Sequence, residues 1–158
     1  MSEFYVAGEK ENHANTRQFA TFMIASRWYG IDVMCVQEVT KPMEVTLMRT
    51  APPFVKGLIN LRGQIATAIG LRELFALPLE ESNEKMTVVC KVEDVLLSLL
   101  VDNIGDVVEV SDSKFEKSPQ TIPANIKEFM LGVYKTDHAI LSIISLDTIL
   151  HQLDKRCA

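Results

Sequence analysis

Two stretches of this chain repeat one another. Residues 57–75 and 132–150 align without a gap, and each runs from a glycine through an apolar strand, a polar turn and a second apolar strand into an amphipathic helical turn. The repeat predicts a fold built by duplication, because composition alone gives roughly one identity over such a stretch. The identical pairs are Gly57 with Gly132, Ile65 with Ile140, Ile69 with Ile144 and Leu71 with Leu146.

The likeness of the two copies continues more weakly upstream. In order, Ile31, Val33, Val36, Glu38 and Val39 correspond to Leu99, Val101, Ile104, Asp106 and Val107. The copies differ most in the turn of the hairpin, which spans residues 60–63 (NLRG) in the first copy and 135–138 (KTDH) in the second. We therefore expect function to depend on the places where the two copies differ.

The chain pattern predicts an all-β fold. Residues 19–26 and 29–39 are rich in β-branched and aromatic residues, which favours strands. Pro42 lies in the segment that follows, so we expect that segment to be an edge strand or a loop. Many short strands, a short helix after Gly70 and a C-terminal helix indicate two small barrels side by side. Apolar residues recur at helical spacing in the C-terminal helix, at Leu146, Ile149, Leu150 and Leu153.

Length and composition suggest a single domain. With 158 residues, 47% of them hydrophobic, the chain can bury one substantial core. Residues 1–16 are polar and predict a flexible tail, and residues 17–158 form the domain, in two interleaved halves of about 17–78 and 79–158. No apolar run is long enough to span a bilayer and residues 1–16 lack a signal-peptide pattern, so we expect a cytoplasmic protein.

Residues with catalytic or ligand-binding chemistry are sparse. No nucleotide-binding loop, nucleophile elbow or zinc-binding helix motif is present, and the histidines (His13, His138, His151) lack ligand spacing. Cys35, Cys90 and Cys157 are far apart, and the first two lie in apolar runs typical of buried cysteines. A net charge of −5 argues against nucleic-acid binding. We predict no catalytic residues, no metal and no cofactor.

Glu38 and Arg62 are candidates for an ion pair. Residues 55–69 form a strong hairpin candidate in which Gly63 can supply the positive φ of a short turn, so Arg62 lies at or beside the turn. The duplication places the strand of Glu38 next to this hairpin, which makes an ion pair between Glu38 and Arg62 geometrically reasonable. An exposed pair contributes only about 0 to 1 kcal/mol to stability, so such a pair would point to recognition more than to folding.

Four short motifs follow one another in the first half of the chain: residues 29–33 (YGIDV), 36–39 (VQEV), 51–52 (AP) and 57–65 (GLINLRGQI). In this order and at this spacing they closely resemble the CheW family of chemotaxis coupling proteins. Residues 100–107 (LVDNIGDV) carry a looser version of a second-half motif. The resemblance covers about residues 19–153, and it departs at residues 65–72 (IATAIGLR), where the family often has IVPVIDLR.

The resemblance implies two five-stranded barrels without catalytic activity. Proteins of the family bridge the cytoplasmic tips of methyl-accepting chemoreceptors to the regulatory domain of the CheA histidine kinase, in membrane-associated arrays that can include further CheW copies. Carried over by motif, the receptor-binding residues would be Val33, Val36, Glu38, Asn60, Arg62 and Ile104. The kinase-binding residues would be Met43, Val45 and Lys56.

Two alternatives remain open at the level of sequence. A CheW-like scaffold of another receptor and kinase pathway, such as twitching motility, would have the same fold and different partners. A small-barrel enzyme or oligonucleotide binder is the other. The acidic charge and the absence of stacking aromatics on a basic strand face count against the binder, and the absence of a cluster of polar catalytic residues counts against the enzyme.

Overall fold

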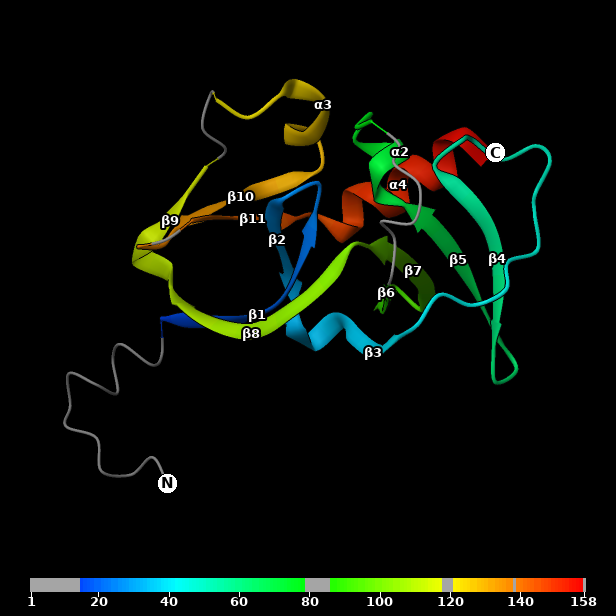
Figure 1. Ribbon diagram of the computed structural model, residues 1–158, viewed down its shortest axis with the longest axis horizontal. Helices are drawn as coiled ribbons and strands as arrows, with labels where there is room; N and C mark the ends of the chain where they lie inside the picture. The colour runs from blue at the N-terminus through cyan, green and yellow to red at the C-terminus, as the bar shows by residue number, and fades with distance from the viewer. Residues whose placement is uncertain (1–14, 79–85, 118–120, 138, 158) are drawn as a thin grey trace.

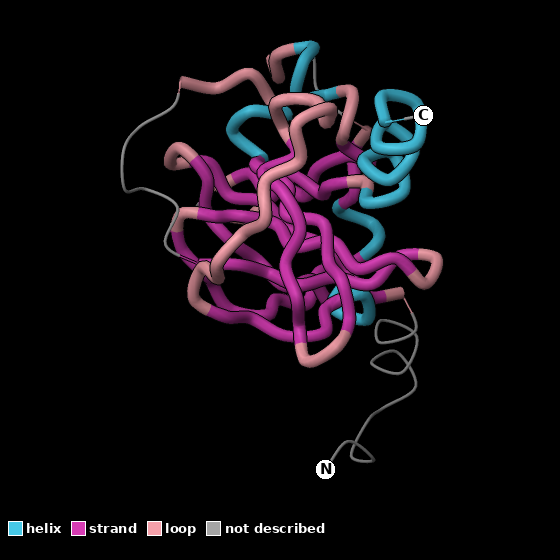
Figure 2. The backbone as a smooth tube through the Cα atoms, turned by 90° about the vertical axis from the view of Figure 1, so that its right-hand side faces the viewer, coloured by secondary structure: helices cyan, strands magenta, loops and turns pink. Residues whose placement is uncertain are grey.

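A computed structural model describes residues 15–78, 86–117, 121–137 and 139–157 of the chain. The tail expected over residues 1–16 lies mostly outside this part, and Thr16 already belongs to the first strand. Strands make up the body of the molecule, and short helices lie at its periphery (Figure 2). The all-β prediction is therefore confirmed.

The strands form two mixed sheets. Sheet A has the order β8 (Asn103–Ser111), β1 (Thr16–Ile24), β2 (Arg27–Asp32), β11 (Ile140–Ile144), β10 (Met130–Lys135) and β9 (Phe115–Glu116). Sheet B has the order β3 (Val36–Thr40), β6 (Met86–Val92), β7 (Val95–Val101), β5 (Gln64–Gly70) and β4 (Val55–Leu61). The helical segments are η1 (Val33–Cys35), α2 (Leu71–Leu74), η2 (Asp112–Lys114), α3 (Ala124–Lys127) and α4 (Leu146–Cys157).

The strand order of sheet B repeats in sheet A, as the duplication predicts. Reading along each sheet, β3, β6, β7, β5 and β4 correspond to β8, β1, β2, β11 and β10, and each sheet has one parallel pair, β5 with β7 and β11 with β2. Sheet A carries β9 in addition, so it has six strands where five were expected.

Neither sheet is confined to one half of the chain. The strands β1 and β2 of the first half belong to sheet A, with strands of the second half, and β6 and β7 complete sheet B. The chain changes sheets twice, through η1 between β2 and β3, and at Asp102 between β7 and β8. The helix η1 also divides residues 29–39, which we expected to form one strand, because the Asp32 side chain accepts a hydrogen bond from the Met34 amide and starts a helical turn.

The largest apolar cluster lies between the two sheets. Alternate residues of both sheets point into it, including Phe22 and Tyr29 from sheet A and Val88 and Leu99 from sheet B. A series of ring contacts crosses this core, with centroid distances of 6.2 Å from Phe22 to Tyr29, 5.6 Å from Tyr29 to Phe75 and 6.0 Å from Phe75 to Phe129. We call this cluster the inter-sheet core.

Each sheet also buries its other face. The side chains of Ile59, Leu61, Ala66, Ala68 and Val89 form a separate cluster on sheet B, and those of Phe19, Tyr134, Leu141 and Ile143 form one on sheet A. Two-sided burial is what a small curled sheet needs when it packs against its own copy. The helices α2, α3 and α4 lie along one side of the molecule, and β8, η1 and β3 follow one another along the other (Figure 1).

Candidate functional site

The hairpin between β4 and β5 presents Arg62. Leu61 pairs with Gln64, and the two turn residues have positive φ, 49° at Arg62 and 90° at Gly63. Positive φ at both positions is the signature of a type I′ turn, and its twist matches that of the flanking strands. The Asn60 side chain stabilises the turn by accepting a hydrogen bond from the Gly63 amide at 3.0 Å. The expectation that Gly63 supplies positive φ is confirmed, and Arg62 shares that conformation.

Arg62 forms the predicted ion pair with Glu38. The Nη2 atom of Arg62 donates to Oε2 of Glu38. The two partners differ in exposure, since 79% of the Arg62 side chain and 27% of the Glu38 side chain face solvent. Glu38 lies on β3, the first strand of sheet B, and the Arg62 hairpin begins with β4, the last strand, so the pair joins the two edges of the sheet.

A hollow of about 250 Å³ lies at this pair. Its lining combines polar groups at the rim, Gln37 and Gln64, with Leu61, Val89 and Leu96, which belong to or pack on the cluster of sheet B. The surface of the hollow is mostly polar, so it offers donors and acceptors to the polar end of a partner segment.

The remaining residues expected at the receptor surface lie on neighbouring elements. Val33 lies in η1 and Val36 begins β3, both half-buried, and Val36 packs on the inter-sheet core. Ile104 lies on β8, paired with Phe22, and is 37% exposed. The tip of the β4–β5 hairpin also points to the side of the molecule along which β8, η1 and β3 run (Figure 1). Their role in receptor binding stays a prediction.

The residues expected at the kinase surface lie on and beside the other edge of sheet B. Residues 41–54 form a loop with an isolated bridge from Thr46 to Leu58 of β4, so of the edge strand or loop that Pro42 predicted, the loop is found. Within the loop Met43 is exposed, and Val45 packs on the cluster of sheet B. Lys56 lies on β4 and pairs with Glu73 of α2. Their role in kinase binding also stays a prediction.

Gly57 explains how the loop can lie so close to β4. Its φ of +142° is a conformation that other residues rarely adopt, and a Cβ atom there would overlap Val45 and the backbone of Thr46. The glycine that begins both copies of the repeat thus permits a close approach of two backbone segments. At Gly132 the same space is taken by Phe115 and Glu116 of β9.

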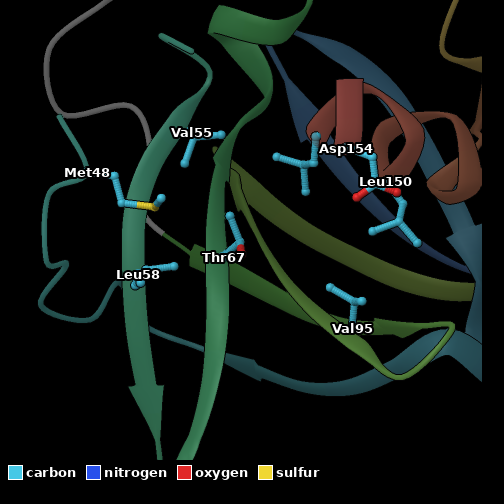
Figure 3. A pocket seen from close by; sticks show the side chains of 8 residues that line it. Met48, Val55, Leu58, Thr67, Val95, Leu150 and Asp154 are labelled. Carbon is cyan, nitrogen blue, oxygen red and sulfur yellow. The ribbon is translucent and has the colours of Figure 1, made fainter. Parts of the chain in front are cut away.

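One hollow was not anticipated from the sequence. A groove of about 400 Å³ lies at the margin of the inter-sheet core, between α4 and the face of sheet B that carries Leu58 and Thr67 (Figure 3). Met48 approaches it from the loop before β4, Val95 from the β6–β7 hairpin and Asp154 from α4. The sequence signal was the alternation of Leu58 and Thr67 with the buried residues of the sheet B cluster along the same strands.

The cysteines fit the expectation of small buried residues in part. Cys90 is fully buried in the inter-sheet core, and burial, with a smaller effect of Cys35, raises the pKa of its thiol well above the ordinary range. Cys35 is half-buried, and burial followed by the charges of Asp32 and Asp147 raises its pKa too. Raised pKa values keep both thiols protonated, the opposite of a reactive nucleophile. The side chains of His13, His138 and Cys157 lie outside the described residues.

Within the described ranges, no group of three or more His, Cys, Asp or Glu side chains could hold a metal ion. Among the helices of that same part of the chain, none has the length and apolar character to cross a membrane.

Comparison with known proteins identifies the family. The sequence model of one protein family, the CheW-like domain, matches residues 18–154 of this chain. The chain belongs to the CheW-like domain family. The chemotaxis protein CheW of Treponema pallidum is 33% identical over 134 residues, which cover 82% of this chain and 79% of that protein. The chemotaxis protein CheW of Helicobacter pylori is 27% identical over 95% of this chain and 91% of its own length.

A solved structure has the same fold. The crystal structure of the scaffolding protein TtCheW from Thermoanaerobacter tengcongensis superposes with a TM-score of 0.74 and 28% sequence identity. The match covers 82% of this chain and 89% of that one. The resemblance inferred from the motifs is therefore confirmed, as are the two β-sheets with few helices.

Proposed function

We propose that this protein is a non-enzymatic adaptor that couples chemoreceptors to the CheA histidine kinase in bacterial chemotaxis. The observation that carries the proposal is the Arg62–Glu38 pair, which holds a largely exposed guanidinium beside a mostly polar hollow on a CheW-family fold. The adaptor would work in the cytoplasm, at membrane-associated receptor arrays.

The geometry suits a receptor helix laid against β8, η1 and β3. A helix that binds in a groove needs apolar contacts along one stripe and polar contacts at its ends. Val33, Val36 and Ile104 would supply the apolar contacts, and Asn60 and Arg62 the polar end. An arginine suits this position because its planar fork of donors matches carboxylates and carbonyl groups.

The kinase would bind elsewhere on the same sheet. Met43, Val45 and Lys56 lie on β4 and on the loop that covers it, whereas the Arg62 hairpin marks the far end of that strand. Separate surfaces let the protein hold both partners at once, and bridging in this way requires no catalytic group.

A mixing experiment with purified partners tests the proposal. The full chain is combined with a chemoreceptor cytoplasmic-tip fragment and a CheA regulatory domain from the same organism, and complexes are separated by size. We expect binary complexes with each partner and a ternary complex with both. Binding to neither partner would contradict the proposal, and binding to a receptor and kinase of a twitching-motility system instead would favour the scaffold of another pathway.

A further inference from the structure

A buried ion pair lies at one of the two places where the chain changes sheets. Arg72 of α2 is 3% exposed and Asp102 is 8% exposed. The guanidinium binds the carboxylate with two atoms, Nη2 to Oδ2 at 2.6 Å and Nε to Oδ1 at 3.3 Å. The Nη1 atom of Arg72 donates to the Pro78 carbonyl at 2.9 Å. The fork of the arginine is thus oriented by partners on two sides.

Asp102 also forms hydrogen bonds with the β1–β2 hairpin of sheet A. Its Oδ2 atom accepts a hydrogen bond from the Ala25 amide at 2.8 Å, in the turn between β1 and β2. Its own amide donates to the Met23 carbonyl at 3.0 Å. One carboxylate therefore links α2, which follows a strand of sheet B, with the β1–β2 hairpin of sheet A.

The other change of sheets has no such pair. In the alignment of the two copies, Asp102 corresponds to Met34 and Arg72 corresponds to Asp147. A methionine and an aspartate cannot form an ion pair, and Met34 is 85% exposed. The duplication has diverged here, because the ion pair of Arg72 and Asp102 has no counterpart at the corresponding residues Asp147 and Met34.

The two kinds of contact between the sheets differ in directionality. The inter-sheet core is apolar, and apolar burial favours contact without specifying an orientation. A two-point arginine–carboxylate contact has defined geometry. A buried ion pair is weak support for stability, since its desolvation offsets much of its attraction, and orientation is the better-supported role.

We propose that the Arg72–Asp102 pair is a positioning element that fixes the angle between sheets A and B. Ile104 lies on β8 of sheet A, two residues after Asp102. Glu38 lies on β3 of sheet B, and Arg62 lies in the β4–β5 turn of the same sheet. The angle between the sheets therefore sets the spacing of the receptor-contact residues. This consequence for receptor binding rests on the proposed function, whereas the effect on the sheet angle does not.

The test removes the pair without leaving a buried charge. In the double variant Arg72→Met/Asp102→Asn, the asparagine oxygen can still accept from the Ala25 amide. Residual dipolar couplings of backbone amides are fitted separately for the two sheets. In the unmodified protein one alignment tensor should describe both sheets, and in the variant the two tensors should differ in orientation. A single tensor for both sheets in the variant would overturn the proposal.

The matched control is Lys56→Met/Glu73→Met. This change also removes a partly buried ion pair of α2, but one that joins α2 to β4 of the same sheet. One tensor should still describe both sheets. If the control separated the tensors as much as the double variant does, general loosening would replace positioning as the explanation.

A second variant and a second readout complete the design. Arg72→Lys retains the charge and loses the fork, so it should shift the sheet angle even if the double variant fails to fold.

Affinity for the receptor-tip fragment should fall about tenfold in the double variant, with kinase-domain affinity unchanged. If the unmodified protein bound no receptor tip, the proposed function would fail and the dipolar couplings would still decide the role of the pair.

Discussion

At the scale of single residues, the molecule depends on two glycines whose backbone conformation other residues rarely adopt. Gly57 and Gly63 both have positive φ, but their surroundings differ. A Cβ atom at Gly57 would overlap Val45 and the Thr46 backbone, whereas one at Gly63 would meet nothing within 4 Å. The two glycines therefore separate the effect of steric overlap from that of backbone conformation.

We predict that Gly57→Ala destabilises the protein more than Gly63→Ala. The change at Gly63 should cost about 1 kcal/mol, for the left-handed conformation alone. The change at Gly57 should cost about 3 kcal/mol or more, since an unfavourable φ is combined with overlap. Urea unfolding measures the change in the free energy of unfolding for each variant. Equal losses would show that the loop can move away from a side chain at position 57 without cost.

At the scale of elements, hairpin turns set the register of both sheets. The equivalent hairpins β1–β2 and β6–β7 turn at Ala25–Ser26 and Glu93–Asp94, and all four residues have positive φ, between 49° and 66°. Type I′ turns favour Asn-Gly, and alanine is a poor residue for this conformation. The amide of Ala25 bonds to Asp102, and any residue except proline supplies that amide.

We predict that Ala25→Asn/Ser26→Gly stabilises the protein by about 1 kcal/mol, a rise in melting temperature of about 2 to 4 °C. Glu93→Asn/Asp94→Gly is the matched change in the other copy and should act in the same direction. Calorimetry measures both. A fall in melting temperature for the first variant alone would mean that the turn near Asp102 requires more than its backbone shape.

The elements also show what sequence reasoning can reach. The β4–β5 hairpin was predictable because Gly63 and the flanking apolar runs lie next to one another in the chain. The membership of the sheets was not, because a three-residue helical turn at η1 sends β3 to the other sheet. The pairing of Arg72 with Asp102 was missed for the same reason, since neither residue's neighbours indicate the other.

At the scale of the whole molecule, the two sheets should unfold as one unit. They share the inter-sheet core, and each half of the chain contributes strands to both sheets. Neither half of the chain can therefore complete a sheet by itself. Cooperative unfolding without stable intermediates is the usual behaviour of single domains near this size.

Leu141→Ala tests this cooperativity. Leu141 is fully buried in the cluster of sheet A, away from sheet B, and its truncation should cost about 2 to 5 kcal/mol. Native-state hydrogen exchange should show an equal loss of protection for the slowest amides of sheet A and of sheet B. A loss confined to sheet A would contradict a single unit.

We propose that receptor and kinase bind separate surfaces, with Arg62 on the receptor surface. The most direct test is Arg62→Asp, with Asp137→Arg at the equivalent turn of the other copy as control. Aspartate tolerates the positive φ of this turn, so the melting temperature should change by no more than about 2 °C.

The measurement compares the affinities of both variants for a receptor-tip fragment and for the kinase regulatory domain. For Arg62→Asp we expect at least a thirtyfold loss of receptor affinity, about 2 kcal/mol, because the substitution removes the donor fork and places a like charge beside Glu38. Kinase affinity should be unchanged, and Asp137→Arg should alter neither. Equal loss of both partners by Arg62→Asp, or a large fall in its melting temperature, would show that Arg62 stabilises the fold and forms no separate receptor contact.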